Sequence, residues 1–218
     1  MQPIGLFGGT FDPIHCGHLR TAFELWQELG LHEVRFLPSG QPPHRDQLYA
    51  SAELRLKMVE AAVADQPGFV VDDREVRRSG VSYSVDTLTD LRREYPQRSL
   101  CLLLGMDAFL GLPNWHRWRE LLTLAHIVVA HRPGWRAPTT GPLGEVMVDH
   151  GTGSIRVLHQ ERAGRVYVRG VTQLEISSTD LRAALIAGRD PRYLVPEAVR
   201  QIILGTRCYA RTEDRRAP

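Results

Sequence analysis

The chain has 218 residues, of which 43% are apolar and 24% are charged, so it is long enough to bury a hydrophobic core. A formal net charge of +2 is too small to indicate general nucleic-acid binding, and no apolar stretch approaches the roughly 20 residues that a transmembrane helix needs. Three widely spaced cysteines without a CxxC pair argue against a disulfide framework or a zinc site. We therefore expect a soluble, cytoplasmic protein that binds neither nucleic acid nor membranes.

A glycine- and histidine-containing segment lies close to the start of the chain. A short apolar run, residues 4–7, leads into GGTFDPIHCGH, residues 8–18, and apolar residues then recur with helical spacing up to Leu29. The segment is therefore a turn between a strand and a helix, where glycines admit a ligand and free N–H groups attract anions. His15 and His18 can both face one phosphate. A metal site is the alternative, but no cysteine or carboxylate at ligand spacing supports it.

Short apolar runs and segments of helical periodicity alternate along the rest of the chain. Residues 99–104 lack any polar alternation, as a central parallel strand does. The alternation predicts a single α/β domain over residues 1–210, with a doubly wound parallel sheet, helices on both faces and a flexible tail at 211–218. Residues 146–148 fit either a strand or a helix. Further strands are expected at 33–37, 69–71, 126–130 and 165–168, and helices at 51–65, from near 84 to 95, from near 178, and at 196–204.

Polar side chains follow two of the expected strands, and ligands bind outside the carboxyl ends of strands in open α/β sheets. The proline-rich loop 39–45 ends in His44 and Arg45, although a solvated loop with incidental charges is the alternative. Asp107 comes two residues after Gly105, directly beyond the most apolar strand. It could accept hydrogen bonds from ribose hydroxyls, or merely cap the next short helix.

Two expected helix starts are rich in hydroxyl groups. Residues 82–87 could seat a small carboxylate, or Ser82 or Ser84 could simply cap the helix. Residues 177–179 invite the same two interpretations, but Arg182, one turn later, can reach the same anion. Both segments are therefore candidate anion sites as well as ordinary caps.

Trp115 and Trp118 stand three residues apart and would share one face of a helix. We expect one of them to pack in the core and the other to line a pocket. If the strand order reverses between the first strand and residues 99–104, a ligand crevice forms there. Because the chain has neither a Walker lysine motif nor GxGxxG, P-loop hydrolysis and hydride transfer lose support.

Seven motifs, in this order, resemble the HxGH nucleotidyltransferase superfamily and, within it, the bacterial nicotinate-mononucleotide adenylyltransferases (the NadD family). They are GGTFDPIHCGH (8–18), PPHR (42–45), SYSVDTL (82–88), GMDAF (105–109), LPNWHRW (112–118), HRPG (131–134) and ISSTDLR (176–182). The resemblance runs from residue 2 to about residue 209. Each motif is weak by itself, whereas the ordered set is highly specific.

The resemblance implies a Rossmann-like enzyme that adenylylates nicotinate mononucleotide with ATP, giving nicotinate adenine dinucleotide and pyrophosphate in NAD biosynthesis, with Mg²⁺ bound through the ATP phosphates. The acceptor phosphate attacks the α-phosphorus in line, so positioning and charge stabilisation carry the catalysis. The catalytic residues that it implies are His15, His18 and Arg182. The ATP contacts that it implies are Gly8, Gly9, Thr10, Phe11, His15, His18, Gly105, Asp107, Ser177, Ser178, Thr179 and Arg182. The implied contacts with nicotinate mononucleotide are His44, Arg45, Tyr83, Ser84, Thr87, Trp115 and Arg132.

Within the resemblance, the pyridine ring stacks on Trp115, and hydroxyls and amides of residues 83–87 meet its carboxylate. A ring of donors would leave the NH₂ group of a carboxamide unpaired, which favours the acid over the amide. Ser84 stands where family members commonly have threonine, so the hydroxyl is kept and the methyl group is lost.

Two other functions compete with this interpretation. One is an adenylyltransferase of the same superfamily that uses nicotinamide mononucleotide, FMN or phosphopantetheine; Trp115 and residues 82–87 argue against it, because those acceptors need no stacked pyridine with a carboxylate seat. The other is a nonenzymatic nucleotide sensor, which need not retain both His15 and His18. A homo-oligomer is compatible with the sequence, which does not determine the oligomeric state.

Overall fold

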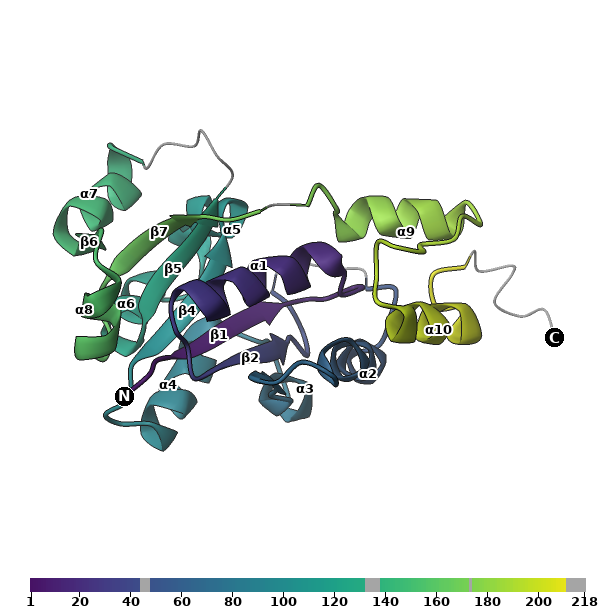
Figure 1. The fold of residues 1–218 in the computed structure, drawn as a ribbon, viewed down its shortest axis with the longest axis horizontal. Helices are drawn as coiled ribbons and strands as arrows, with labels where there is room; N and C mark the ends of the chain where they lie inside the picture. Colours follow the sequence, from purple (N-terminus) through teal and green to yellow (C-terminus); the bar gives the residue numbers. More distant parts are fainter. Residues whose placement is uncertain (44–47, 132–137, 173, 211–218) are drawn as a thin grey trace.

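All strands of the protein run parallel in one sheet, within the residues that the computed structural model describes: 1–43, 48–131, 138–172 and 174–210 (Figure 1). The strands are β1 (Ile4–Gly9), β2 (Glu33–Pro38), β3 (Phe69–Val71), β4 (Leu100–Gly105), β5 (His126–His131), β6 (Gly151–Thr152) and β7 (Val166–Gly170). Each neighbouring pair is parallel, and the order across the sheet is β3-β2-β1-β4-β5-β7-β6. The predicted fold class is confirmed.

Helices connect these strands. They are α1 (Cys16–Glu28), α2 (Ala52–Val63), α3 (Arg74–Arg77), α4 (Ser84–Glu94), α5 (Met106–Leu110), α6 (Leu121–Leu124), α7 (Gly141–His150), α8 (Ile155–Gln160), α9 (Ser178–Ile186) and α10 (Glu197–Thr206), with 3₁₀-helices at Leu112–Asn114 and Trp118–Glu120. Parallel strands need such crossovers, because each strand must return to the same end of the sheet before the next one begins.

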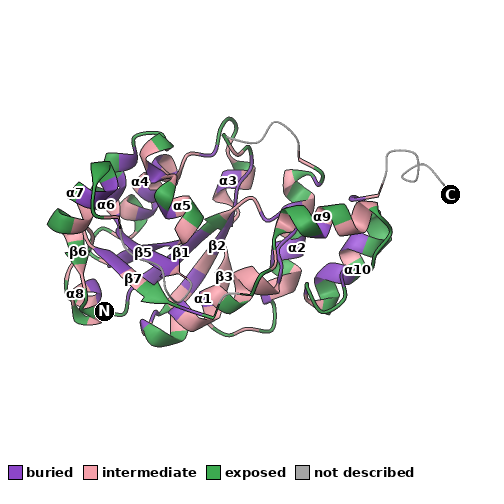
Figure 2. Ribbon diagram, turned by 90° about the horizontal axis from the view of Figure 1, so that it is seen from above, coloured by how far each residue is buried: buried purple, intermediate pink, exposed green. Residues whose placement is uncertain are grey.

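The central strands of the sheet are buried on both faces: β1 and β5 are largely purple in Figure 2, whereas β3, at one edge, has no fully buried residue. Alternate residues of β4 enter two different cores. Cys101 and Leu103 pack with residues of α1, α2 and α10, whereas Leu100, Leu102 and Leu104 pack with residues of α4 and α6. This burial on both faces explains why the side chains of β4 show no alternation between apolar and polar residues. The arrangement is the doubly wound one that the sequence predicts.

The strand order reverses next to β1. Ile4 pairs with Glu33 of β2 on one side and with Leu100 of β4 on the other. The connections that leave β1 and β4 therefore depart toward opposite faces, and a crevice opens between them at the carboxyl ends of the strands. The predicted switch point is confirmed.

Most expected elements begin and end within two residues of their predicted positions. Ser51 caps α2 as predicted, since its hydroxyl accepts a hydrogen bond from the N–H of Leu54 at 3.2 Å. Residues 146–148, which the pattern leaves open, lie in helix α7. β6 and α8 are additional elements that the sequence pattern does not predict. β6 has only two residues, too few for a periodic signal, and it extends the sheet beyond β7.

The alternative in which Ser82 or Ser84 simply caps α4 is wrong. Tyr83 precedes the helix and makes no side-chain cap. The hydroxyl of Ser82 instead accepts the backbone N–H groups of Gly40 at 3.0 Å and Gln41 at 3.3 Å. Ser82 therefore fastens the loop after β2 and does not cap its own helix.

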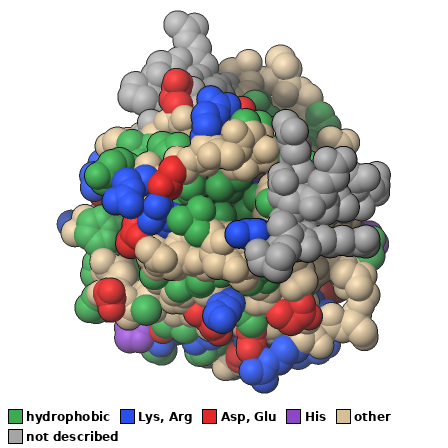
Figure 3. All heavy atoms as spheres, turned by 90° about the vertical axis from the view of Figure 1, so that its right-hand side faces the viewer, with side chains coloured by type: hydrophobic (Ala, Val, Ile, Leu, Met, Phe, Trp, Pro, Cys, Tyr) green, Lys and Arg blue, Asp and Glu red, His purple; other side chains and the backbone are tan. Residues whose placement is uncertain are grey.

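Helices α9 and α10 lie together beside α2, beyond the carboxyl end of β1 (Figure 1). Basic and acidic side chains are interspersed over the side of the molecule that these helices form (Figure 3). Cys16, Cys101 and Cys208 are free thiols. None of the described helices is long and apolar enough to cross a membrane. The tail predicted at 211–218 lies outside the described residues.

Candidate active site

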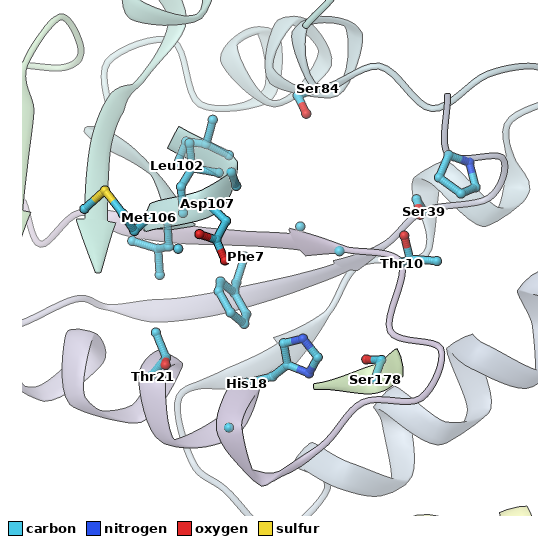
Figure 4. A pocket seen from close by; sticks show the side chains of 18 of the residues that line it. Phe7, Thr10, His18, Thr21, Ser39, Ser84, Leu102, Met106, Asp107 and Ser178 are labelled. Atoms are coloured by element: carbon cyan, nitrogen blue, oxygen red, sulfur yellow. The ribbon is translucent and has the colours of Figure 1, made fainter. Parts of the chain in front are cut away.

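A cavity of about 1050 Å³ lies at the switch point, between the carboxyl ends of β1 and β4 (Figure 4). The starts of α1, α4, α5 and α9 also contribute to its wall. Of the residues predicted from the sequence, its lining brings together Gly8, Gly9, Thr10, His15, His18, Tyr83, Ser84, Gly105, Asp107, Trp115, Ser177, Ser178 and Thr179. Both candidate anion sites, together with the turn of residues 8–18 (the histidine turn), therefore face one cavity.

Three predicted contact residues do not line this cavity. Phe11 is 3% exposed and packs the edge of its ring against His18, with 5.2 Å between the ring centroids. Thr87 is buried, and its hydroxyl donates to Glu75 Oε1 at 2.7 Å. Arg182 donates from Nη1 to the carbonyl oxygen of Asp12 at 2.7 Å. These three side chains contact other protein groups behind the wall of the cavity, and they do not face the space that a ligand would fill. His44, Arg45 and Arg132 lie outside the described residues.

The turn before α1 stacks two imidazoles. The backbone N–H of His15 donates to Nδ1 of His18 at 3.3 Å, and the two ring centroids are 3.7 Å apart. Since Nδ1 of His18 accepts this bond, the neutral ring carries its proton on Nε2. A Cβ at Gly17 would stand 3.0 Å from Nδ1 of His15. The glycine between the histidines is thus needed for the stack, because His18 prevents the His15 ring from moving aside.

His15 is a neutral group at the wall of the cavity. It is 5% exposed, and this burial lowers its pKa from 6.5 to about 4. Its Nδ1 atom finds no hydrogen-bond partner among the described residues. A buried polar atom without a partner is rare in folded proteins and is a mark of functional sites. The ring can offer a hydrogen bond to a ligand, and an anion bound there would favour its charged form.

Two glycines leave the cavity open where β1 and β4 end. A Cβ placed on Gly105 would meet no atom within 4 Å, and one on Gly8 would meet only the carbonyl oxygen of Leu37, at 4.0 Å. The protein does not need glycine at these positions for its own packing. The space that the missing side chains leave belongs to the cavity, so a ligand can approach both strand ends closely.

Asp107 lies in the first turn of α5 and lines the cavity from the β4 side (Figure 4). It does not cap this helix, because Gly105 is the residue before α5 and no side chain caps it. The alternative in which Asp107 merely caps its helix is therefore wrong. The carboxylate remains available to accept hydrogen bonds from a bound molecule.

Aromatic side chains line another part of the cavity. Trp115 is half-buried and lines the cavity, whereas Trp118 is 8% exposed and packs in the core, so the predicted division between pocket and core is confirmed. The two do not share a helix, because Arg117 between them has a left-handed φ of 50°. Tyr83 lies against His116, with ring centroids 4.4 Å apart. Since no side chain caps α4, the N–H groups of Ser84 and Val85 are open to an anion, whereas that of Asp86 donates to the carbonyl oxygen of Tyr83 at 3.1 Å.

Two charged residues that support the cavity are not predicted from the sequence. Arg55 of α2 is fully buried and donates to the carbonyl oxygens of Thr10, at 2.6 Å, and Gly40, at 3.0 Å. It joins the loops after β1 and β2. Glu75 lines the cavity beneath α4, and burial raises the pKa of its carboxyl group. Both occur in charged helical segments that resemble solvated surface, so the sequence offers no signal for their burial.

Comparison with known proteins identifies the family. A family model described as cytidylyltransferase-like matches residues 6–184. A probable nicotinate-nucleotide adenylyltransferase from Aeromonas hydrophila is 51% identical over 201 residues, which cover 92% of this chain and 94% of the relative. The chain belongs to the nicotinate-nucleotide adenylyltransferase family. A probable member from Methylococcus capsulatus is 46% identical over 209 residues, covering 95% of this chain and all of the relative. The family predicted from the seven motifs is confirmed.

Solved structures share the fold of this family member. A nicotinic acid mononucleotide adenylyltransferase from Plasmodium falciparum, complexed with NaAD, is similar with a TM-score of 0.74 at 17% identity, covering 96% of this chain and 98% of the other. A structure described as a putative nicotinate-nucleotide adenylyltransferase from Vibrio parahaemolyticus gives a TM-score of 0.65 at 19% identity, covering 100% and 98%. The structural similarity thus extends past residue 184 and includes α10.

Proposed function

We propose that this protein transfers the adenylyl group of ATP to nicotinate mononucleotide, releasing pyrophosphate and forming nicotinate adenine dinucleotide for NAD biosynthesis. The family membership supports this reaction. The structural observation that carries the proposal is that one cavity joins the stacked histidines to Trp115 and the open start of α4. At about 1050 Å³ it lies just above the usual range for small-molecule pockets, roughly 300–1,000 Å³, as a site for two nucleotides should.

ATP occupies the half of the cavity between β1, β4 and α9. Asp107 accepts hydrogen bonds from a ribose, and the space beside Gly8 and Gly105 admits the nucleoside and the α-phosphate. Ser178 and Thr179 line the cavity at the start of α9, where free N–H groups attract the distal phosphates. These are the roles that the motifs imply for Asp107, Ser178 and Thr179, whereas Arg182, also implied at the triphosphate, binds the carbonyl oxygen of Asp12 and does not line the cavity.

The reaction exchanges one P–O bond for another. An oxygen of the acceptor's 5′-phosphate bonds to the α-phosphorus, while the bond from that phosphorus to the bridging oxygen breaks and its electron pair leaves with pyrophosphate. His15 and His18 face the phosphates, and His18 in its neutral form can donate from Nε2 to the developing charge. Donors fixed in advance stabilise the transition state without reorganising, so no protein nucleophile is required.

Mg²⁺ enters as part of the ATP complex. The only carboxylates among the described lining residues are Glu75 and Asp107, and the described part of the chain contains no cluster of three or more His, Cys, Asp or Glu that could hold a metal. Such a wall suits a metal that is bound through phosphate oxygens and water, as Mg²⁺ commonly is. When bound, the ion neutralises charge on the triphosphate and on the leaving pyrophosphate.

The acceptor occupies the aromatic half. Its pyridine ring stacks on Trp115, and its carboxylate meets Tyr83, Ser84 and the open N–H groups of α4. A carboxylate accepts hydrogen bonds only, whereas a carboxamide would turn an NH₂ group toward these donors. Thr87, predicted as a further contact, acts behind the wall through its bond to Glu75.

Pyrophosphate release tests the proposal. The protein is supplied with ATP, Mg²⁺ and one acceptor at a time: nicotinate mononucleotide, nicotinamide mononucleotide, phosphopantetheine, or none. We expect rapid release with the nicotinate compound and much slower release with its amide. Equal rates with the acid and the amide would overturn the specificity, and release only with phosphopantetheine would overturn the function itself.

A further inference from the structure

The histidine turn is anchored at Asp12, whose side chain points away from the reaction. Asp12 is 1% exposed. Its Oδ2 accepts the backbone N–H of Tyr49 at 3.1 Å, and its Oδ1 accepts the N–H of Ala50 at 3.3 Å and the hydroxyl of Tyr209 at 2.7 Å. Donors from the segment before α2 and from the segment after α10 thus meet on one carboxylate.

The Tyr209 hydroxyl has the Asp12 carboxylate as its hydrogen-bond partner. It is 1% exposed, and burial together with the neighbouring Asp12 carboxylate raises the pKa of its hydroxyl. The hydroxyl therefore stays protonated and donates a hydrogen bond to Asp12. A hydrogen bond from a neutral donor to a charged acceptor is among the stronger ones in proteins.

The backbone of the same turn is held by the segment between β7 and α10. Arg182 donates to the carbonyl oxygen of Asp12 at 2.7 Å, and the Ser178 hydroxyl donates to that of Pro13 at 3.1 Å. The N–H of Cys16, the first residue of α1, donates to the carbonyl oxygen of Leu194 at 2.9 Å. The turn is thus fixed along its length by groups from a distant part of the chain.

These contacts hold the turn in a backbone conformation that is unfavourable by itself. Phe11, next to Asp12, has a left-handed φ of 49°, a conformation that side chains other than glycine seldom adopt. Such strain persists only where surrounding contacts over-determine the local structure. His15 follows three residues after Asp12, and its stack with His18 leaves little freedom to compensate for a displaced turn.

We propose that Asp12 and Tyr209 are positioning residues for the adenylyl transfer: they hold the turn so that His15 and His18 meet the phosphates of ATP. The inference rests on the proposed function. Neither residue lines the cavity, so their effect reaches the substrates only through the turn. A network that served stability alone would not act through the histidines.

The test is a double-mutant cycle on kcat that combines Tyr209→Phe with His18→Ala. Tyr209→Phe removes one hydroxyl and is expected to lower kcat about tenfold, with KM for nicotinate mononucleotide within about twofold of the wild-type value. In the His18→Ala background the same substitution is expected to change kcat by only about threefold, because one of the two imidazoles that the turn positions is gone and only His15 remains. An equal proportional loss in both backgrounds, or no loss in either, would overturn the proposal.

Two companions complete the experiment. Tyr95→Phe removes a tyrosine hydroxyl that accepts from Arg35 at 2.8 Å, away from the cavity lining, and kcat should not change. Asp12→Asn keeps the side-chain volume and should lower kcat as Tyr209→Phe does. If neither Asp12→Asn nor Tyr209→Phe folds, the network serves stability and the inference fails. A wild-type protein inactive with nicotinate mononucleotide would instead refute the proposed function, whereas fully active variants would refute only this inference.

Discussion

The buried imidazole of His15 makes the stability of the protein depend on pH. Its pKa is about 4 in the folded protein and 6.5 in the unfolded chain, because burial removes the water that stabilises the charged ring. Between these values the unfolded state binds more protons than the folded state. The contribution of the neutral ring is therefore complete above the unfolded pKa and is lost as the pH falls toward the folded one.

The size of the effect follows from the two pKa values. At about pH 4.5 nearly all unfolded chains carry a proton on His15, whereas only about a quarter of folded molecules do. Compared with pH 7, the linkage relation gives a loss of about 2 kcal/mol in the free energy of unfolding. Carboxyl groups also titrate in this range, so the prediction concerns the difference between the wild type and a variant that lacks the imidazole.

Urea unfolding followed by tryptophan fluorescence measures this difference. The wild type should lose about 2 kcal/mol more than His15→Gln between about pH 7 and about pH 4.5, since the variant has no proton to take up at that site. His32→Gln, which replaces an exposed histidine, is the matched control and should behave like the wild type. Equal losses in the wild type and in His15→Gln would refute the explanation by burial.

Three substitutions test the proposed site. His18→Ala should lower kcat by about 10²–10³ with little change in KM for ATP, because the contact strengthens in the transition state; a change confined to KM in steady-state assays of pyrophosphate release would contradict this role. Trp115→Ala should raise KM for nicotinate mononucleotide about tenfold, the worth of one aromatic stack, while KM for ATP stays constant; a matching rise for ATP would mean that the tryptophan supports the whole cavity. Gly105→Ala should leave the melting temperature within a few degrees of the wild-type value but reduce kcat/KM for ATP, because the added Cβ meets no protein atom within 4 Å and enters only the ligand's space; unchanged kinetics would place the nucleotide elsewhere.

The sheet could be predicted because burial leaves a strong signal in the sequence. Residues 100–104 are buried, and their unbroken apolar run identifies a central strand. β6 leaves no such signal, because its pairing with β7 involves backbone groups of only two residues. The starts of the helices near Ser84 and Ser178 could also be predicted, since hydroxyl-bearing residues directly precede segments of helical apolar periodicity.

The site could be predicted as a set of segments, but not the direction of every side chain within it. Thr87 lies one turn beyond Ser84, yet it is buried behind the cavity lining, where its hydroxyl donates to Glu75. Arg182 suits an anion by its chemistry, but it reaches the carbonyl oxygen of Asp12. Arg55 looks like a solvated residue of α2 and is fully buried. In each case the partner comes from a segment distant in sequence, so only the tertiary arrangement decides.

The bond between Tyr209 and Asp12 spans 197 positions of the chain. Contacts of such sequence separation form late, because a long loop must close before they contribute free energy. During synthesis the strand that carries the histidine turn emerges first, whereas its anchor emerges nearly 200 residues later. If Tyr209 positions the histidines as proposed, a growing chain can form the first strand and helix before the site is complete, and full activity requires that the segment after α10 has docked on Asp12.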